Sequence, residues 1–165
     1  MFSSASRVLE QAIALKAFPA AVIEVGDATR PLWRQAFGRL RFEADAPQTA
    51  EDTIFDLASL TKVLATTALV MQQVERGALG LEDRVGQHVA AWEGADRAHV
   101  TVRDLLAHCG GLTAYVPFYR DYRVGSDPTG GLTPQVRGAF ERAICSMPLE
   151  YEPRTRAVYS DLGFM

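Results

Sequence analysis

The pattern of apolar and polar positions at the start of the chain predicts one helix followed by two strands. Apolar residues spaced three and four apart predict an amphipathic helix over 4–16, with Ser3 or Ser4 as its N-cap. Two extended apolar runs follow at 20–25 and 32–38, separated by a short polar turn region that contains Gly and Asp. This arrangement predicts an antiparallel β-hairpin.

After residue 53 the pattern changes and predicts mostly helices. The polar, acidic stretch at 42–53 is typical of a surface loop, and a strong helical pattern then runs from about 59 to 76, where glycines end it. Prolines, glycines and aspartates at 113–131 predict little regular structure. Shorter helices are expected at 85–89, at 101–108 with a capping box of Thr101 and Asp104, and at 134–146 after a Thr133 cap.

The predicted elements do not add up to a complete sheet. A single two-stranded hairpin is marginal in water, and Leu162–Met165 resembles the first turn of an apolar helix. We therefore expect the N-terminal part of a longer protein, with a helix and hairpin over 1–57, a helical part over 58–165 and the C-terminal strands absent. The isolated fragment is expected to be inactive and poorly soluble.

Composition excludes several classes of function. Hydrophobic residues make up 48% and charged residues 22%, which is typical of a globular domain, and the net charge of -3 offers no basic field for nucleic acid. Charged residues interrupt the first apolar run, so we expect no signal peptide, no membrane span and a cytoplasmic protein. The two cysteines and three histidines lack metal-ligand spacing, so reduced thiols and no metal are expected.

Ser59 and Lys62 are the clearest candidates for catalytic residues. Residues three apart share one face of a helix, so the serine hydroxyl can lie beside the lysine amine. Apolar neighbours such as Leu60 and Val63 are expected to screen Lys62 from water, so that it loses its proton and accepts that of the serine. The alternative interpretation is that Ser59 only caps the helix and Lys62 is a solvated surface charge.

Four segments in chain order extend this pattern well beyond the Ser-x-x-Lys spacing. They are IFDLASLTK at 54–62, VERGALGLED at 74–83, VTVRDLLAHCGGL at 100–112 and YSDLGF at 159–164. In this order they resemble the nucleophile segment, the helix exit, the His-x-x-Gly-Leu corner and the Tyr-Ser-Asp motif of the serine β-lactamase, penicillin-binding protein and esterase superfamily. The resemblance covers about residues 20–165.

This resemblance implies an α+β, β-lactamase-like fold, in which an antiparallel sheet flanked by helices is joined to a mostly helical region. The chain then holds an incomplete N-terminal part of that fold, and the family's third motif, Lys/His-x-Gly, falls beyond Met165. The resemblance also implies that Ser59 is the nucleophile and that Lys62 and Tyr159 carry protons. Which of the two takes the serine proton stays open.

Asp161 stands where many relatives carry Asn. An ionised Asp only accepts hydrogen bonds, whereas Asn also donates them, so this residue is expected to bind substrate as an acceptor or to anchor its loop. His108 is expected to play a structural hydrogen-bonding role, because the chain has no G-x-S-x-G elbow and Ser-x-x-Lys enzymes need no histidine base.

The function that the resemblance implies is serine acyl hydrolysis of a small-molecule ester or amide through an acyl-enzyme, with no cofactor. The expected lack of an export signal favours an esterase-like activity over a β-lactamase or a D-alanyl-D-alanine peptidase. The alternative from another class is a non-catalytic binding or scaffold protein that keeps the fold. The sequence does not indicate an oligomeric state.

Overall fold

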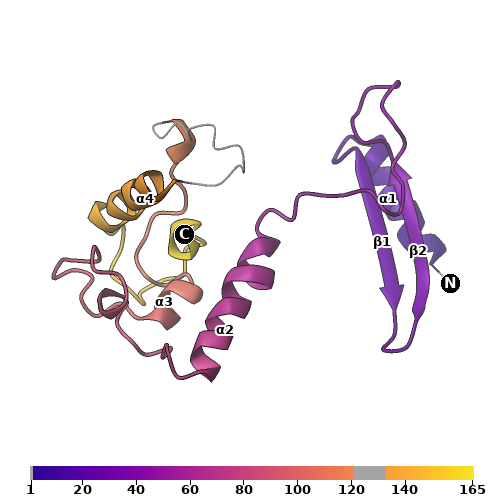
Figure 1. Ribbon diagram of the computed structural model, residues 1–165. Coiled ribbons are helices and arrows are strands. Elements are labelled where there is room, and N and C mark those ends of the chain that lie inside the picture. The colour runs from indigo at the N-terminus through magenta and orange to yellow at the C-terminus, as the bar shows by residue number, and fades with distance from the viewer. Residues whose placement is uncertain (1, 121–132) are drawn as a thin grey trace. The chain divides into compact units, whose positions relative to one another are not determined.

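The computed structural model describes residues 2–120 and 133–165, and it divides into two compact units, Met1–Asp56 and Leu57–Met165 (Figure 1). Part of the irregular segment expected at 113–131 lies outside the described residues. No helix among those described is both long and apolar enough to cross a membrane.

The first unit consists of α1 (Ser3–Ala14) and an antiparallel hairpin of β1 (Ala20–Gly26) and β2 (Pro31–Gly38). This confirms the predicted hairpin. The carboxylate of Asp27 in its turn accepts hydrogen bonds from the backbone N–H groups of Thr29 (2.7 Å) and Arg30 (3.0 Å). Such a side-chain turn replaces backbone pairing where the strands reverse, which explains why the Gly-Asp sequence ends β1.

The predicted cap of the first helix is wrong. The N-cap is Phe2 rather than Ser3 or Ser4, and no side chain caps the first turn. The ring of Phe2 stacks on that of Trp33 with centroids 4.9 Å apart, so an aromatic contact with β2 fixes the chain where the helix begins. The helix ends before the expected residue 16, because Lys16 has a left-handed backbone with φ 57°.

The second unit is mostly helical, and its helices are short. Its elements are η1 (Lys62–Thr67), α2 (Ala68–Glu75), η2 (Val85–Gln87), α3 (Val102–Leu106), η3 (Phe118–Arg120), α4 (Pro134–Ser146) and η4 (Leu162–Phe164). The Thr101 capping box and the Thr133 cap are confirmed, since both hydroxyls accept from the backbone N–H three residues on. The prediction of one continuous helix over 59–76 is wrong, because the residues of η1 form a π-helix.

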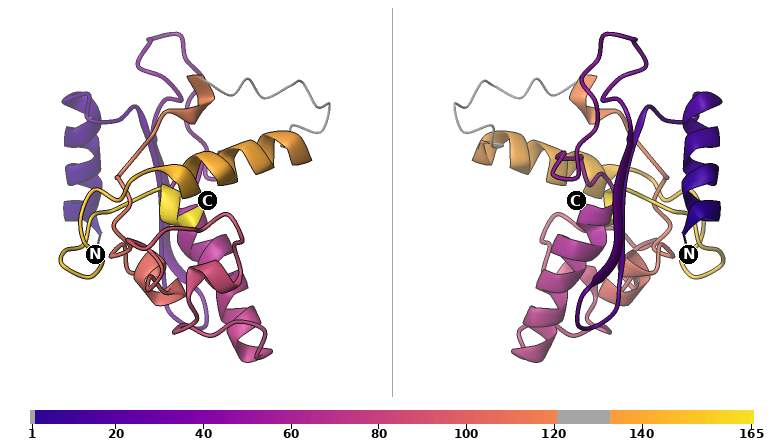
Figure 2. Two further views of the ribbon diagram at one scale, coloured as in Figure 1. Left: turned by 90° about the vertical axis from the view of Figure 1, so that its left-hand side faces the viewer. Right: turned by 90° about the vertical axis from the view of Figure 1, so that its right-hand side faces the viewer.

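One hydrophobic core joins the distant parts of the second unit. Within the described residues it brings Ile144 of α4 and Leu162 of η4 against Val100, which is fully buried. Figure 2 shows α4, in orange, next to the yellow C-terminal turn. Burying one such aliphatic side chain stabilises a fold by about 1.5–3 kcal/mol. The C-terminal residues are therefore anchored by packing rather than by regular secondary structure.

A buried carboxylate ties α3 to the loop that precedes the C-terminal turn. Asp104 accepts hydrogen bonds from Arg154 at 2.8 and 2.9 Å and from the backbone N–H and hydroxyl of Thr101, both at 2.8 Å. Burial alone raises the pKa of Asp104, but the hydrogen bonds from Arg154 and Thr101 outweigh it and lower that pKa to about 2. The ionised form is thus strongly favoured in the folded state.

We predict that Asp104→Asn, introduced into the full-length protein, lowers the free energy of unfolding by about 2 kcal/mol at pH 7. The folded-state pKa lies below the ordinary value of 3.8, so this stabilisation is present above pH 3.8 and is lost as the pH falls towards 2. Urea unfolding at a series of pH values measures the difference. The exposed Asp45→Asn is the control, and a difference that persists unchanged at pH 2 contradicts the assignment.

Candidate active site

Ser59 and Lys62 lie in a tight opening turn that places one side chain above the other. The backbone N–H groups of Leu60, Thr61 and Lys62 donate to carbonyl groups three residues earlier, at 2.9–3.1 Å. In this i→i+3 pattern the side chains at i and i+3 are eclipsed. Lys62 Nζ accordingly donates to Ser59 Oγ at 3.1 Å. The shared face expected from the sequence is therefore present, although a 3₁₀-like turn rather than an α-turn produces it.

Two features next to this turn depart from regular helix geometry. Ala58, the residue before the serine, has φ 43°, a left-handed conformation that is strained for a residue with a side chain. Directly after the turn the π-helix η1 begins, and the Thr67 hydroxyl donates to the carbonyl of Lys62 at 2.8 Å. Such strain and π-helical turns are frequent at functional sites.

The C-terminal loop brings Tyr159 and Asp161 to the same amine. Lys62 Nζ donates to Asp161 Oδ1 at 2.6 Å and lies 5.1 Å from the centroid of the Tyr159 ring. The lysine side chain is 15% exposed and that of the aspartate 34%, so the ion pair is partly shielded from water. All four residues expected from the sequence to form the site, Ser59, Lys62, Tyr159 and Asp161, thus come together in the second unit.

The charge state expected for Lys62 needs correction. The hydrogen bond to Asp161 and a weaker one to Tyr159 raise the pKa of Lys62 above its ordinary value, although burial acts in the opposite direction. The neighbours that were expected to screen it from water, Leu60 and Val63, are 58% and 62% exposed. Lys62 is therefore an ammonium at neutral pH, and its carboxylate partner stabilises that charge further.

The Tyr159 phenol is shifted in the direction that favours its anion. Hydrogen bonding with Ser59 and then with Lys62 lowers the pKa of Tyr159 below its ordinary value of 10. The Ser59 hydroxyl thus has two neighbours, the Lys62 ammonium as a hydrogen-bond donor and the Tyr159 phenol with its increased acidity. A lowered pKa increases the population at neutral pH of the phenolate, which is the form of Tyr159 that can accept a proton.

These groups open on a pocket of about 470 Å³. Ser59, Lys62, Thr67, His108 and Tyr159 contribute its polar side chains, and the remaining lining is apolar: Leu57, Leu60, Val63, Leu106 and Phe164. A mostly apolar pocket with a few convergent polar groups is the usual form of a small-molecule site. The carbonyl of a small ester or amide can therefore approach the serine here.

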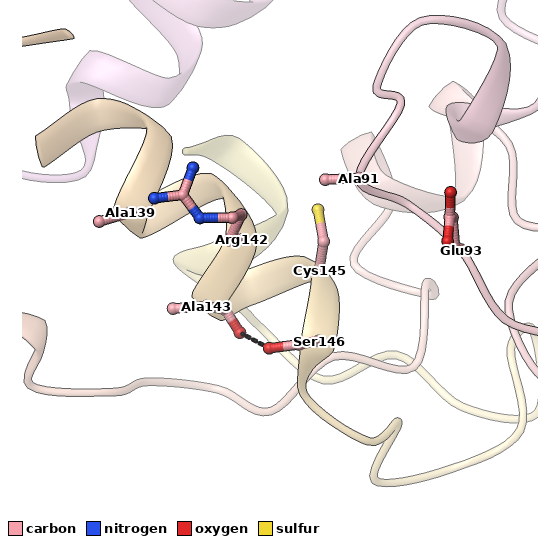
Figure 3. Close-up of a pocket in the computed structure, with 7 residues that line it drawn as sticks. All are labelled: Ala91, Glu93, Ala139, Arg142, Ala143, Cys145 and Ser146. Atoms are coloured by element: carbon pink, nitrogen blue, oxygen red, sulfur yellow. Dashed lines mark hydrogen bonds between the residues drawn. The ribbon is translucent and has the colours of Figure 1, made fainter. Parts of the chain in front are cut away.

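A second pocket, of about 550 Å³, lies between α4 and the segment around Ala91 (Figure 3). Burial raises the pKa of the Cys145 thiol there, so that this sulfur stays protonated and is a poor nucleophile. Glu93 and Arg142 also line the pocket. In residues 2–120 and 133–165 no cluster of three His, Cys, Asp or Glu side chains could hold a metal ion. The serine pocket is accordingly the better candidate for a catalytic site.

Comparison with known proteins assigns the chain to a family. The family model described as Beta-lactamase matches residues 5–165, so the chain belongs to the beta-lactamase family of serine hydrolases. A protein of Escherichia coli K12 named "Putative D-alanyl-D-alanine carboxypeptidase" is 33% identical over 121 residues, which are 68% of this chain and 26% of that protein. An N-acetylmuramyl-L-alanine amidase of Bacillus subtilis is 28% identical over 90% of this chain and 35% of its own length.

Solved structures agree on the fold. A class C beta-lactamase matches with a TM-score of 0.74 and 19% identity, over 98% of this chain and 40% of the other. A beta-lactamase of Bacteroides dorei, named as putative, matches with a TM-score of 0.72 and 19% identity, over 99% of this chain and 43% of the other. The chain therefore has the beta-lactamase fold predicted from the sequence, and it spans about a quarter to a third of the length of the two curated relatives.

We predict that Asp161→Asn lowers the pKa of Lys62, because the largest contribution that raises this pKa is the hydrogen bond to the Asp161 carboxylate. The measurement is an NMR titration of the Lys62 side chain in the full-length protein, in which Lys62→Arg identifies its signal. Glu75→Gln, which removes an exposed carboxylate from the same unit, is the control. An unchanged titration of Lys62 in the Asp161→Asn variant contradicts the geometry of the pair.

Proposed function

We propose that the protein is a serine acyl hydrolase that cleaves an ester or amide through an acyl-enzyme on Ser59. The observation that carries this proposal is the position of Ser59 Oγ, 3.1 Å from the Lys62 ammonium and hydrogen-bonded to the Tyr159 phenol. A serine hydroxyl is a weak nucleophile until a neighbouring base removes its proton. Membership of the beta-lactamase family supports hydrolase chemistry at this site.

In this proposal Tyr159 rather than Lys62 takes the serine proton. Lys62 already carries its full set of protons, and Asp161 holds them there, so it can donate hydrogen bonds but cannot accept a proton. The Tyr159 phenol, ionised with the help of Lys62, accepts the proton as Ser59 Oγ bonds to the carbonyl carbon. Tyr159 then returns that proton to the leaving oxygen or nitrogen as its bond to carbon breaks.

The second half of the reaction uses the same groups in reverse. Water attacks the acyl-enzyme carbonyl and gives a proton to Tyr159, and the proton then passes to Ser59 Oγ as the acyl group departs as an acid. Lys62 stays charged in both halves of the reaction. Its positive charge therefore lowers the free energy of the Tyr159 phenolate in each half. The names of the two relatives above refer to amide substrates, and an ester carbonyl meets the same groups here.

We predict that Ser59→Ala lowers turnover of a chromogenic short-chain ester, or of a chromogenic cephalosporin, by at least about 10³-fold. Tyr159→Phe is expected to lower it by about 10²–10⁴-fold, the range for loss of a general base. Initial rates of the full-length protein on both substrates measure the effect and show which carbonyl class is preferred. Ser146→Ala, which removes a serine hydroxyl exposed on α4, is the matched control.

The nucleophile is identified separately by covalent labelling. Mass spectrometry after treatment with a fluorophosphonate or penicillin probe is expected to find the added mass on the peptide that carries Ser59. Equal turnover by wild type and Ser59→Ala rejects the proposal. A folded protein with neither label nor turnover supports instead a non-catalytic binding role for this pocket.

A further inference from the structure

The two residues that flank Tyr159 both donate hydrogen bonds to a single histidine, His108. The backbone carbonyl of His108 accepts from the N–H of Val158 at 2.9 Å, and its ring Nδ1 accepts from the N–H of Ser160 at 3.1 Å. The two ring centroids of His108 and Tyr159 lie 4.5 Å apart. Tyr159 is itself 54% exposed, so its position depends largely on the hydrogen bonds of the residues that flank it.

His108 is in turn fixed by its own surroundings. It follows α3 with a left-handed backbone, φ 58°, and its carbonyl also accepts from the Tyr151 hydroxyl at 3.1 Å. On another side of the ring lies Phe164, with centroids 5.1 Å apart. The imidazole is therefore held in one orientation, with its Nδ1 directed at the backbone of the Tyr159 loop.

The hydrogen bond from Ser160 defines which nitrogen of His108 is protonated. A backbone N–H can only donate, so Nδ1 must carry a lone pair and the neutral ring must have its proton on Nε2. If a second proton binds at Nδ1, two N–H groups face each other and the hydrogen bond is lost. Only the neutral imidazole can accept this hydrogen bond from Ser160, the residue next to Tyr159.

The charged groups around this ring act against its protonation. Burial, and then the ammonium of Lys62, lower the pKa of His108 below its ordinary value, while the Asp161 carboxylate acts in the opposite direction. The ionisable hydroxyl groups that face His108 are those of Tyr159, beside the ring, and Tyr151, on the carbonyl. The net effect keeps the imidazole neutral at neutral pH.

We propose that His108 is a positioning residue, whose neutral imidazole fixes Tyr159 against Ser59 and Lys62 and whose protonation releases the Tyr159 loop in mild acid. This inference rests on the proposed function, because it predicts that the rate of acyl transfer falls in acid when His108 is protonated. His108 itself lies outside the groups that react. The role goes beyond structural support, since it depends on the protonation state of one nitrogen.

Two variants separate the acceptor at Nδ1 from the ring as a whole. His108→Asn keeps an acceptor oxygen on the same carbon, tolerates a positive φ and cannot gain a proton in this range. His108→Phe keeps an aromatic ring and loses the acceptor. At pH 7.5 we expect kcat of the Asn variant within about threefold of wild type. For the Phe variant we expect kcat at least about tenfold lower with KM within twofold, the loss of about one hydrogen bond.

The pH profile of kcat gives the decisive comparison. Wild type is expected to lose activity in mild acid with an apparent pKa equal to that of the His108 ring, and this acid limb is expected to disappear in His108→Asn. An unchanged acid limb in the Asn variant overturns the proposal. So does a Phe variant with wild-type kcat and KM.

A readout that needs no turnover keeps this test separate from that of the proposed function. The ¹⁵N shifts of the His108 ring in the inactive Ser59→Ala variant report which nitrogen is protonated. We expect the Nε2–H form at pH 7.5, and a proton on Nδ1 at that pH overturns the proposal even if the Phe variant does not fold. Turnover that survives Ser59→Ala instead rejects the acyl-enzyme while leaving this tautomer assignment intact.

Discussion

The hydrogen-bonded ion pair between Lys62 Nζ and Asp161 Oδ1, 2.6 Å long, is the interaction on which the site depends. It joins the turn that carries Ser59 to a loop 99 residues later in the chain. A partly buried ammonium without a partner would carry a large desolvation cost. The carboxylate offsets this cost and at the same time fixes the protonation state of the amine.

The loop that supplies Asp161 is ordered by backbone hydrogen bonds to the segment that follows α3. Glu150, Arg154, Val158 and Asp161 donate their N–H groups to the carbonyls of residues 111, 109, 108 and 114, at 2.8–3.0 Å. Satisfied backbone groups allow a segment without helix or strand to keep one conformation. Gly111 permits this approach, because a Cβ there would meet the carbonyl oxygen of Tyr151 at 2.7 Å and φ is 86°.

Local signals in the sequence predicted the elements, and a family resemblance predicted the fold. The turn at Asp27 and the caps at Thr101 and Thr133 depend on neighbours within a few residues, so they were accessible from the sequence. The interaction that raises the pKa of Lys62 was not accessible from the sequence, because its partner is a carboxylate 99 positions away. Asp161 itself was the available signal: an anion in place of the relatives' neutral amide could have indicated a partner cation.

Asp161 has two opposed effects on Tyr159. Its negative charge directly raises the pKa of the phenol, yet by keeping Lys62 protonated it maintains the ammonium that lowers this pKa. The contribution of Lys62 is larger than the direct one of Asp161, because the ammonium is hydrogen-bonded to the phenol whereas the carboxylate acts on it only through space. A neutral Asn at position 161 would remove the repulsion between the carboxylate and the Tyr159 phenolate. It would also lower the pKa of Lys62. In the proposed mechanism the carboxylate thus stabilises the fixed positive charge on Lys62 and leaves Tyr159 as the group that exchanges protons.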